Sequence, residues 1–215
     1  MSAVLGLDGA RGGWAGALIE DGAVRLLRFP SIGDALALDV AVVGIDMPIG
    51  LPPEGRRECD LLAKRALGSA HSRVFHAPPR PVLAATTYAE GAAVHRVHAG
   101  GLGMSVQTWN IVPRIVEVDE AADDPRVVEV HPELSFAAIA GTVLPSKRTA
   151  QGRAARVEAV RRLWPRLGEI PRGDDTLDAL AVAWSALRWR DGSATVLPAG
   201  ATSYDDRGRP MRIVT

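Results

Sequence analysis

Four aspartates are the residues whose type and spacing best suit chemistry. Asp8 ends one short apolar run of the chain, and Asp46 ends another. Such runs are typical of buried strands, where a carboxylate is unfavourable unless it is paired or bound to a cation. Asp175 and Asp178 open an alanine-rich segment at helical spacing, so both side chains lie on one face. If the four carboxylates converge, they form an all-oxygen site suited to Mg²⁺ or Mn²⁺.

Three of these aspartates, Asp8, Asp175 and Asp178, also have a purely structural interpretation. Asp8 precedes Gly9 and therefore suits a turn. Asp174 or Asp175 suits the N-cap of the helix that follows, worth about 1 kcal/mol, and Asp178 is favoured by the helix dipole. Capping explains one aspartate more easily than three within five residues. The sequence leaves both interpretations open.

Apolar alternation and turn residues predict the elements that would position these side chains. Strands are expected at 3–8, 13–20 and 23–29, and Asp21-Gly22 is a strong hairpin turn between the last two. Further expected elements are a helix at 32–38, a strand at 41–46, a strand at 127–130, and helices at 132–140, 148–164 and 174–190. This order predicts an α/β fold, a ribonuclease-H-like mixed sheet flanked by helices. In that sheet the strand ending at Asp8 should lie between the strand ending at Asp46 and the hairpin.

The segment 51–125 breaks this pattern. It holds expected helices at 56–67 and around 86–98, separated by loops rich in Pro, Gly and His. The segment is too long for an idle loop inside a compact domain. We therefore predict a single ribonuclease-H-like domain over 1–215, with a cap-like helical and loop insertion at 51–125.

Further candidate site residues lie after the insertion and in the first turn. Glu133 is a candidate catalytic acid, but it also suits the first turn of its helix. His131 is a candidate general base or hydrogen-bond donor, although a satisfied buried histidine is more common. Arg11 in the first turn and Lys147 before a basic helix are candidate substrate contacts.

Three residues of the insertion combine an amide, an aromatic ring and a guanidinium group. These are Gln107, Trp109 and Arg114. Such a set can stack on a base and read its edge, so the three are candidate substrate-binding residues. Packing of Trp109 within the insertion is the more common role for such a residue.

Composition excludes several classes of protein. The 215 residues carry 25 basic and 25 acidic side chains, so nucleic-acid binding would need a local basic patch. Cys59 is the lone cysteine, which excludes an intrachain disulfide. The absence of a Cys/His cluster in the sequence argues against a structural zinc site. We see no signal peptide and no apolar run of about 18 residues, so we expect a cytoplasmic protein without membrane contact.

Motifs spread over nearly the whole chain occur together in one known family. They are Gly6-Leu7-Asp8-Gly9-Ala10, Asp46-Met47-Pro48-Ile49-Gly50-Leu51-Pro52, Glu129-Val130-His131-Pro132-Glu133, Leu144-Pro145-Ser146-Lys147 and Asp174-Asp175-Thr176-Leu177-Asp178. This combination resembles the family of domains of unknown function numbered 429, described as predicted ribonuclease-H-like nucleases. The last motif also resembles the final helix of RuvC-type resolvases, which implies metal-ligand roles for Asp175 and Asp178 and leaves Asp174 as the cap. Resolvases usually carry Glu where this chain has Asp46, which reaches less far.

These observations predict a metal-dependent nuclease. Two Mg²⁺ or Mn²⁺ ions held by Asp8, Asp46, Asp175 and Asp178 would activate water and stabilise the leaving oxygen. The expected partner is nucleic acid, with DNA or RNA left open, as is the oligomeric state. One alternative is an actin-like phosphotransferase relative that uses the glycine-rich turn 9–13 for phosphate. The other is a non-catalytic nucleic-acid-binding or interaction module, in which the four acids would not converge.

Overall fold

The computed structural model describes residues 2–171 and 173–215, which form two compact units. The first unit comprises 1–46, 124–195 and 214–215, and the second comprises 47–123 and 196–213. The chain therefore leaves the first unit after Asp46 and returns to it at Asp124. The second unit contains most of the predicted insertion, together with the C-terminal segment 196–213, which was not predicted to belong to it.

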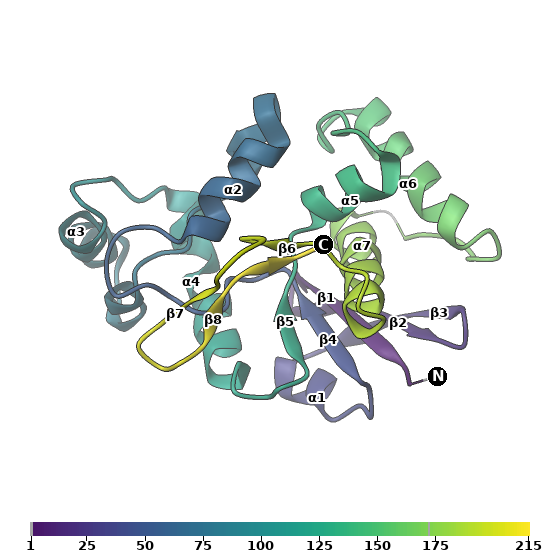
Figure 1. Cartoon of the computed structure of the whole chain (residues 1–215), viewed down its shortest axis with the longest axis horizontal. Helices are drawn as coiled ribbons and strands as arrows, with labels where there is room; N and C mark the ends of the chain where they lie inside the picture. Colours follow the sequence, from purple (N-terminus) through teal and green to yellow (C-terminus); the bar gives the residue numbers. More distant parts are fainter. Residues whose placement is uncertain (1, 172) are drawn as a thin grey trace. The chain divides into compact units, whose positions relative to one another are not determined.

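A five-stranded mixed sheet forms the centre of the first unit (Figure 1). Its strands are β1 (Val4–Ala10), β2 (Gly13–Glu20), β3 (Ala23–Phe29), β4 (Val42–Ile45) and β5 (Val127–Glu129), in the order β3-β2-β1-β4-β5. The first three strands form an antiparallel meander, whereas β4 runs parallel to both β1 and β5. The predicted ribonuclease-H-like sheet is confirmed, including the position of β1 between β4 and the hairpin.

The hairpin turn and the first helix form for local reasons. Asp21 and Gly22 have positive φ values of 48° and 78°, the conformation that two-residue hairpin loops require. The short helix α1 (Ile32–Leu36) begins with a capping box, in which the Ser31 hydroxyl accepts from the Asp34 amide and Asp34 accepts in return. Both features are encoded within a few residues, so the sequence predicts them well.

Helix α7 (Asp174–Arg190) packs closely on the sheet because two strand positions lack a side chain. A Cβ atom added at Gly6 would lie 2.2 Å from the backbone nitrogen of Ala183, and one at Gly44 would lie 3.2 Å from the Ala186 side chain. The helix buries Ala179, Ala183 and Ala186 completely at this surface. Small residues on both elements therefore set the distance between the helix and β1 and β4.

Two more helices complete the first unit. Helix α5 (Pro132–Ala140) begins with proline at a first-turn position and ends at Gly141, which has the left-handed conformation that favours glycine. Helix α6 (Ala150–Leu163) is capped by the Thr149 side chain, which accepts from the Gly152 amide. Both helices were predicted, α6 with slightly wider bounds.

The second unit is mainly helical. Its helices are α2 (Glu58–Leu67), the 3₁₀ segments η1 (Gly68–Arg73) and η2 (Arg80–Ala84), α3 (Tyr88–His98) and α4 (Val106–Ala121). The two-residue strands β7 (Ser203–Tyr204) and β8 (Pro210–Met211) pair in an antiparallel hairpin, and β6 (Val196–Leu197) pairs with β9 (Ile213–Val214). The sequence failed to predict α4 as a helix because Pro113 lies inside it and normally interrupts helical hydrogen bonding.

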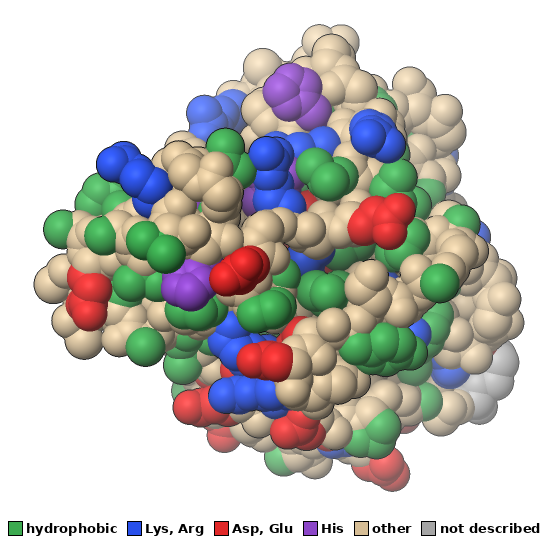
Figure 2. All heavy atoms as spheres, turned by 60° about the vertical axis from the view of Figure 1, so that its left-hand side comes forward, with side chains coloured by type: hydrophobic (Ala, Val, Ile, Leu, Met, Phe, Trp, Pro, Cys, Tyr) green, Lys and Arg blue, Asp and Glu red, His purple; other side chains and the backbone are tan. Residues whose placement is uncertain are grey.

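An ion-pair network joins the C-terminal hairpin to the rest of the second unit. Arg80 Nη1 lies 2.8 Å from Asp119 Oδ2, and Arg80 Nη2 lies 2.5 Å from Asp205 Oδ2. Arg209 Nη1 lies 2.5 Å from the other oxygen of Asp119, and the Leu51 amide donates to Asp205. Figure 2 shows basic and acidic side chains side by side on the lower part of the face that it draws. These pairs explain why residues 196–213 belong to the second unit.

Candidate functional site

Asp8 and Asp46 lie on neighbouring strands of the sheet. Asp8 is in β1 opposite Ala15 of β2, and its side chain is 8 % exposed. Asp46 follows β4, and its amide donates to the Leu7 carbonyl at 3.0 Å, which continues the pairing of β1 with β4. Because adjacent strands are about 4.8 Å apart, this register brings the two aspartates to the same edge of the sheet.

Helix α7 supplies the other two predicted ligands. Gly173 is its N-cap, so Asp174 and Asp175 lie in the first turn, and Asp178 follows one turn later with 3 % exposure. The prediction that Asp174 caps the helix is wrong, because the helix already begins at that residue. Asp174 instead pairs with Arg153 at 3.4 Å. The dipole of α7 favours negative charge near its first turn.

The electrostatics of these carboxylates are coupled. Burial raises the pKa of Asp8 well above its ordinary value, and the charges of Asp46 and Asp178 raise it further, with a smaller contribution from Asp175. Burial and then Asp178 raise the pKa of Asp46 to about 8. Burial also raises the pKa of Asp178. The expected crowding of carboxylates is therefore present, although burial contributes more than mutual repulsion.

Lys147 supplies positive charge to the same place. Its Nζ lies 2.5 Å from Asp178 Oδ2, and its side chain remains 39 % exposed. Burial alone would lower the pKa of Lys147, but Asp178, Asp8 and Asp46 raise it above its ordinary value. The ammonium group therefore stays charged and partly neutralises the acidic cluster. Its place beside these acids could not be read from the sequence, because 31 residues separate it from Asp178.

The second oxygen of Asp178 is a potential cation ligand. Asp178 Oδ1 is buried and has no hydrogen-bond partner in the part of the chain that the structure describes. Within residues 2–171 and 173–215, no three His, Cys, Asp or Glu side chains are arranged to hold a metal ion as they stand. The Asp8 carboxyl is hydrogen-bonded to Asp46, and Lys147 is paired with Asp178, so both contacts compete with coordination.

Glu133 and His131 lie at the start of α5. Glu133 is 8 % exposed and accepts two hydrogen bonds from Arg156 Nη2, at 2.6 and 2.8 Å. Its negative charge contributes to the raised pKa of Asp178. His131 is the N-cap residue of α5, and its carbonyl accepts from Leu134 and Ser135. Glu133 is thus engaged in a buried ion pair with Arg156, a partner that the sequence did not predict.

A cavity of about 400 Å³ lies beside Asp175 in the first unit. Arg11, a predicted substrate contact, is one of its lining residues, and Arg28 is a second basic group there. The full lining consists of Arg11, Gly12, Gly13, Trp14, Arg28, Phe29, Pro30 and Asp175. Sequence reasoning did not single out Arg28, because only the pairing of β2 with β3 brings it to the turn at Arg11.

The candidate base-reading residues of the insertion all belong to α4, in the second unit. The Trp109 ring packs edge-on against Tyr88 at 6.4 Å, and a Cβ at Gly91 would lie 2.6 Å from it. Arg114 Nη1 lies 3.2 Å from Glu117, whereas Gln107 is exposed. Trp109 therefore packs inside its own unit, and a shared base-binding role for the three residues stays a prediction.

Comparison with known proteins identifies the family of the chain. The model of the family described as "Protein of unknown function (DUF429)" matches residues 6–203. The chain belongs to this family. The match spans both the acidic cluster of the first unit and nearly all of the second, and it agrees with the resemblance drawn from the motifs.

Structural comparison found several similar chains, among them two from Thermus thermophilus. The first, "T. thermophilus RuvC in complex with Holliday junction substrate", is 19 % identical, with a TM-score of 0.40 over 90 % of this chain and 98 % of that one. The second, "Thermus thermophilus RuvC structure", is 18 % identical, with a TM-score of 0.35 over 89 % and 97 %. No curated protein matches the chain. None of its described helices is long and apolar enough to span a membrane.

Proposed function

We propose that this protein is a metal-dependent phosphodiesterase that acts on nucleic acid. The observation that carries the proposal is the buried Asp178 Oδ1, which lacks a partner while Asp8, Asp46 and Asp178 all have raised pKa values. Crowded carboxylates in and around a protein interior are unfavourable unless they are paired or bound to a cation, and Asp8 and Asp178 are buried. The ligands would be oxygens of Asp8, Asp46, Asp178 and Asp175, a donor set that suits Mg²⁺ or Mn²⁺.

The residues around the acids would have separate tasks. When bound, the cation would activate water and stabilise the oxygen that leaves phosphorus. Asp8 and Asp46 would give up the proton that they hold between them, and Lys147 would move from Asp178 to the negatively charged phosphate. Arg11, which lines the adjacent cavity, would hold the phosphate on the substrate side.

Thermal unfolding with Mg²⁺ or Mn²⁺ tests the proposal without a guess at the substrate. A cation at about 100 times its dissociation constant stabilises the folded state by about 2.7 kcal/mol, or roughly 5–10 °C for a chain of this size. Asp8→Asn should abolish this shift. Asp174→Asn is the matched control, because it removes the neighbouring charge of α7 and should keep the shift.

Two further measurements bear on the same site. The apparent affinity for Mn²⁺ should rise as the pH approaches about 8, because the ligands must lose protons before they coordinate. Wild type should cleave at least one member of a panel of single-stranded, duplex and branched DNA and RNA with Mn²⁺, and Asp8→Asn should cleave none. A wild-type protein that shows neither a cation shift nor cleavage would contradict the proposal.

A non-catalytic interaction module is the second candidate, and one observation favours it. Lys147 already brings a positive charge to Asp178, so the cluster is partly compensated from within the chain. In that case Mn²⁺ should leave the unfolding temperature of wild type unchanged. An actin-like phosphotransferase is less favoured, because the described part of the second unit has no strand longer than two residues and so no second large sheet.

A further inference from the structure

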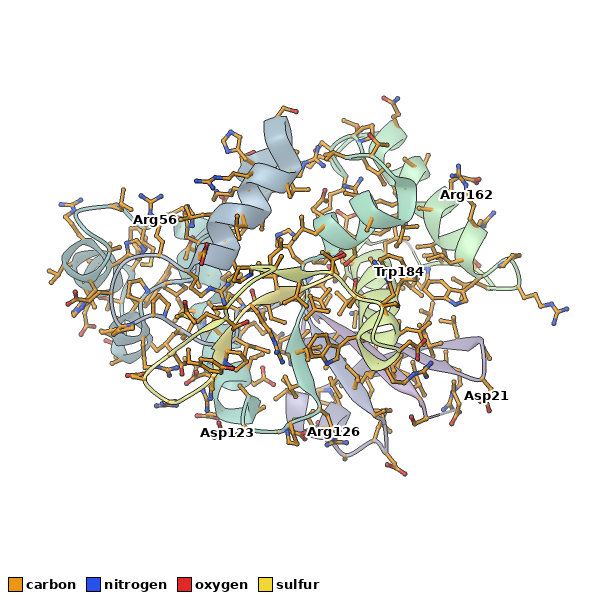
Figure 3. The ribbon with its side chains drawn as sticks, viewed as in Figure 1. Asp21, Arg56, Asp123, Arg126, Arg162 and Trp184 are labelled. Atoms are coloured by element: carbon orange, nitrogen blue, oxygen red, sulfur yellow. The ribbon has the colours of Figure 1, made fainter. Side chains whose placement is uncertain are left out.

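A basic cluster lies in the second unit along α2 and the segment that follows η1. After burial, which is the largest cause, the charges of Lys64 and Arg56 help to lower the pKa of the His76 imidazole. Arg57 acts in the same direction, whereas Asp60 is the carboxylate that opposes them. Figure 3 shows Arg56 beside α2. Two cations and a neutral imidazole thus share one neighbourhood.

The charge of Asp60 is already used within the protein. Its Oδ1 lies 2.5 Å from Arg57 Nη2, its Oδ2 accepts from the Ala77 amide at 2.8 Å, and both side chains of the pair are 1 % exposed. Arg56 and Lys64 have no carboxylate within ion-pair distance in the described part of the chain, and Lys64 Nζ donates to the His71 carbonyl at 3.3 Å. The positive charge of Arg56 and Lys64 is therefore left for an external anion.

The His76 ring points to the same conclusion. Its Nδ1 atom is buried and has no hydrogen-bond partner among the residues that the structure describes. Buried polar atoms are nearly always satisfied, and a missing partner is commonly an ordered water or an ion. A neutral imidazole can donate to a phosphate oxygen, and two adjacent cations favour that oxygen's charge.

An exposed aromatic residue is the neighbour of His76 in the chain. Phe75 directly precedes His76, so their Cα atoms are about 3.8 Å apart, and Phe75 is 43 % exposed. Val74, the residue before it, is buried and anchors the segment. An exposed ring beside bound phosphate is the arrangement by which proteins stack the bases of single strands. In Figure 2 the Lys, Arg and His side chains gather on the upper part of the face, where acidic side chains are few.

We propose that Arg56, Lys64 and His76 bind a backbone phosphate of single-stranded nucleic acid, and that Phe75 stacks on the adjoining base. The neutral net charge of the chain makes this local surplus the means of attraction. A duplex would not suit the site equally well, because its bases are already stacked on one another. The proposal assumes that nucleic acid is the ligand, as the proposed function does, but it requires no metal and no cleavage.

Fluorescence anisotropy with a labelled oligothymidylate of about 20 nucleotides, in excess EDTA, tests the site. Arg56→Ala/Lys64→Ala should weaken binding about tenfold at low salt and reduce the slope of log K against log salt by about 1.4. Arg161→Ala/Arg162→Ala removes the same charge from exposed positions of α6 and is the control; Figure 3 labels Arg162. Phe75→Ala should weaken binding at least about fivefold, whereas Tyr204→Ala, which removes another exposed ring, should not.

The outcomes separate this inference from the proposed function. Selective loss in the Arg56/Lys64 and Phe75 variants, with a weaker response for a duplex of the same sequence, supports the site. If both double variants lose the same affinity for the oligonucleotide, the effect comes from net charge alone and the proposed site is overturned. Failure of wild type to bind the oligonucleotide would also overturn it. A Mn²⁺-dependent thermal shift lost in Asp8→Asn would leave the metal site standing in either case.

Discussion

Asp46→Asn tests the crowding of the acidic cluster through the stability of the metal-free protein. Burial and Asp178 raise the pKa of folded Asp46 from 3.8 to about 8, whereas an unfolded aspartate keeps its ordinary value. Between those two values the unfolded chain has lost its proton and the folded protein still holds it. The contribution of Asp46 to the stability of wild type is therefore fully present below about pH 4, falls as the pH rises, and is lost above about pH 8.

The size of the effect follows from the same shift. A rise of about 4 units, at about 1.4 kcal/mol per unit, gives roughly 5–6 kcal/mol lost between those limits. Asparagine has no proton to lose. Asp46→Asn should therefore match wild type near pH 4 and exceed it near pH 8 by up to about 5 kcal/mol, roughly 10–20 °C in Tm.

Urea and thermal unfolding in excess EDTA across this pH range measure the difference directly. Asp39→Asn, at an exposed position before β4, is the control and should follow wild type at every pH. Subtracting wild type from the variant removes the titration of all unchanged groups. A difference that stays constant from about pH 4 to about pH 8 would refute the argument, because Asp46 would then titrate alike in both states.

Three further substitutions probe the frame of the site. Gly6→Ala should destabilise the protein by at least about 1–3 kcal/mol in urea unfolding, because its Cβ meets the backbone of α7, whereas Gly200→Ala meets nothing and should be nearly neutral. Arg156→Met should cost about 3–5 kcal/mol by leaving Glu133 buried and unpaired, and Glu133→Leu in the same chain should recover most of that loss. Lys147→Gln should lower metal-free stability near pH 8 yet enlarge the Mn²⁺ thermal shift, and an unchanged shift would count against competition between the ammonium and the cation.

The sequence predicted best where short stretches encode structure on their own. Asp21-Gly22 determined the hairpin, and the apolar runs ending at Asp8 and Asp46 predicted the two central strands. The predicted strand order also placed Asp8 and Asp46, two of the four acids, on neighbouring strands. Helical spacing predicted that Asp178 joins these acids, because the turn of α7 that contains Asp178 is buried.

What escaped prediction depends on contacts between distant residues. Lys147 meets Asp178 only because α7 and the loop before α6 fold together. The pairing of Arg80 with Asp205 spans 125 residues, so no local pattern assigned 196–213 to the second unit. Helix α4 was not predicted because Pro113 lies inside it. Ser105 is nevertheless a typical N-cap residue, and its hydroxyl accepts a hydrogen bond from the Thr108 amide. A proline inside a helix is unfavourable but tolerable when tertiary packing compensates.

The close packing of α7 on Gly6 and Gly44 has a consequence for genetic screens. Neither glycine carries a group that can do chemistry, yet any side chain at Gly6 would push away the helix that holds Asp178. In a saturation library scored by activity, Gly6 should tolerate replacement as poorly as the aspartates, because its Cβ would meet backbone atoms of α7. A selection scored by the amount of folded protein would separate the two classes, because asparagine in place of Asp8 should still accumulate while alanine in place of Gly6 should not.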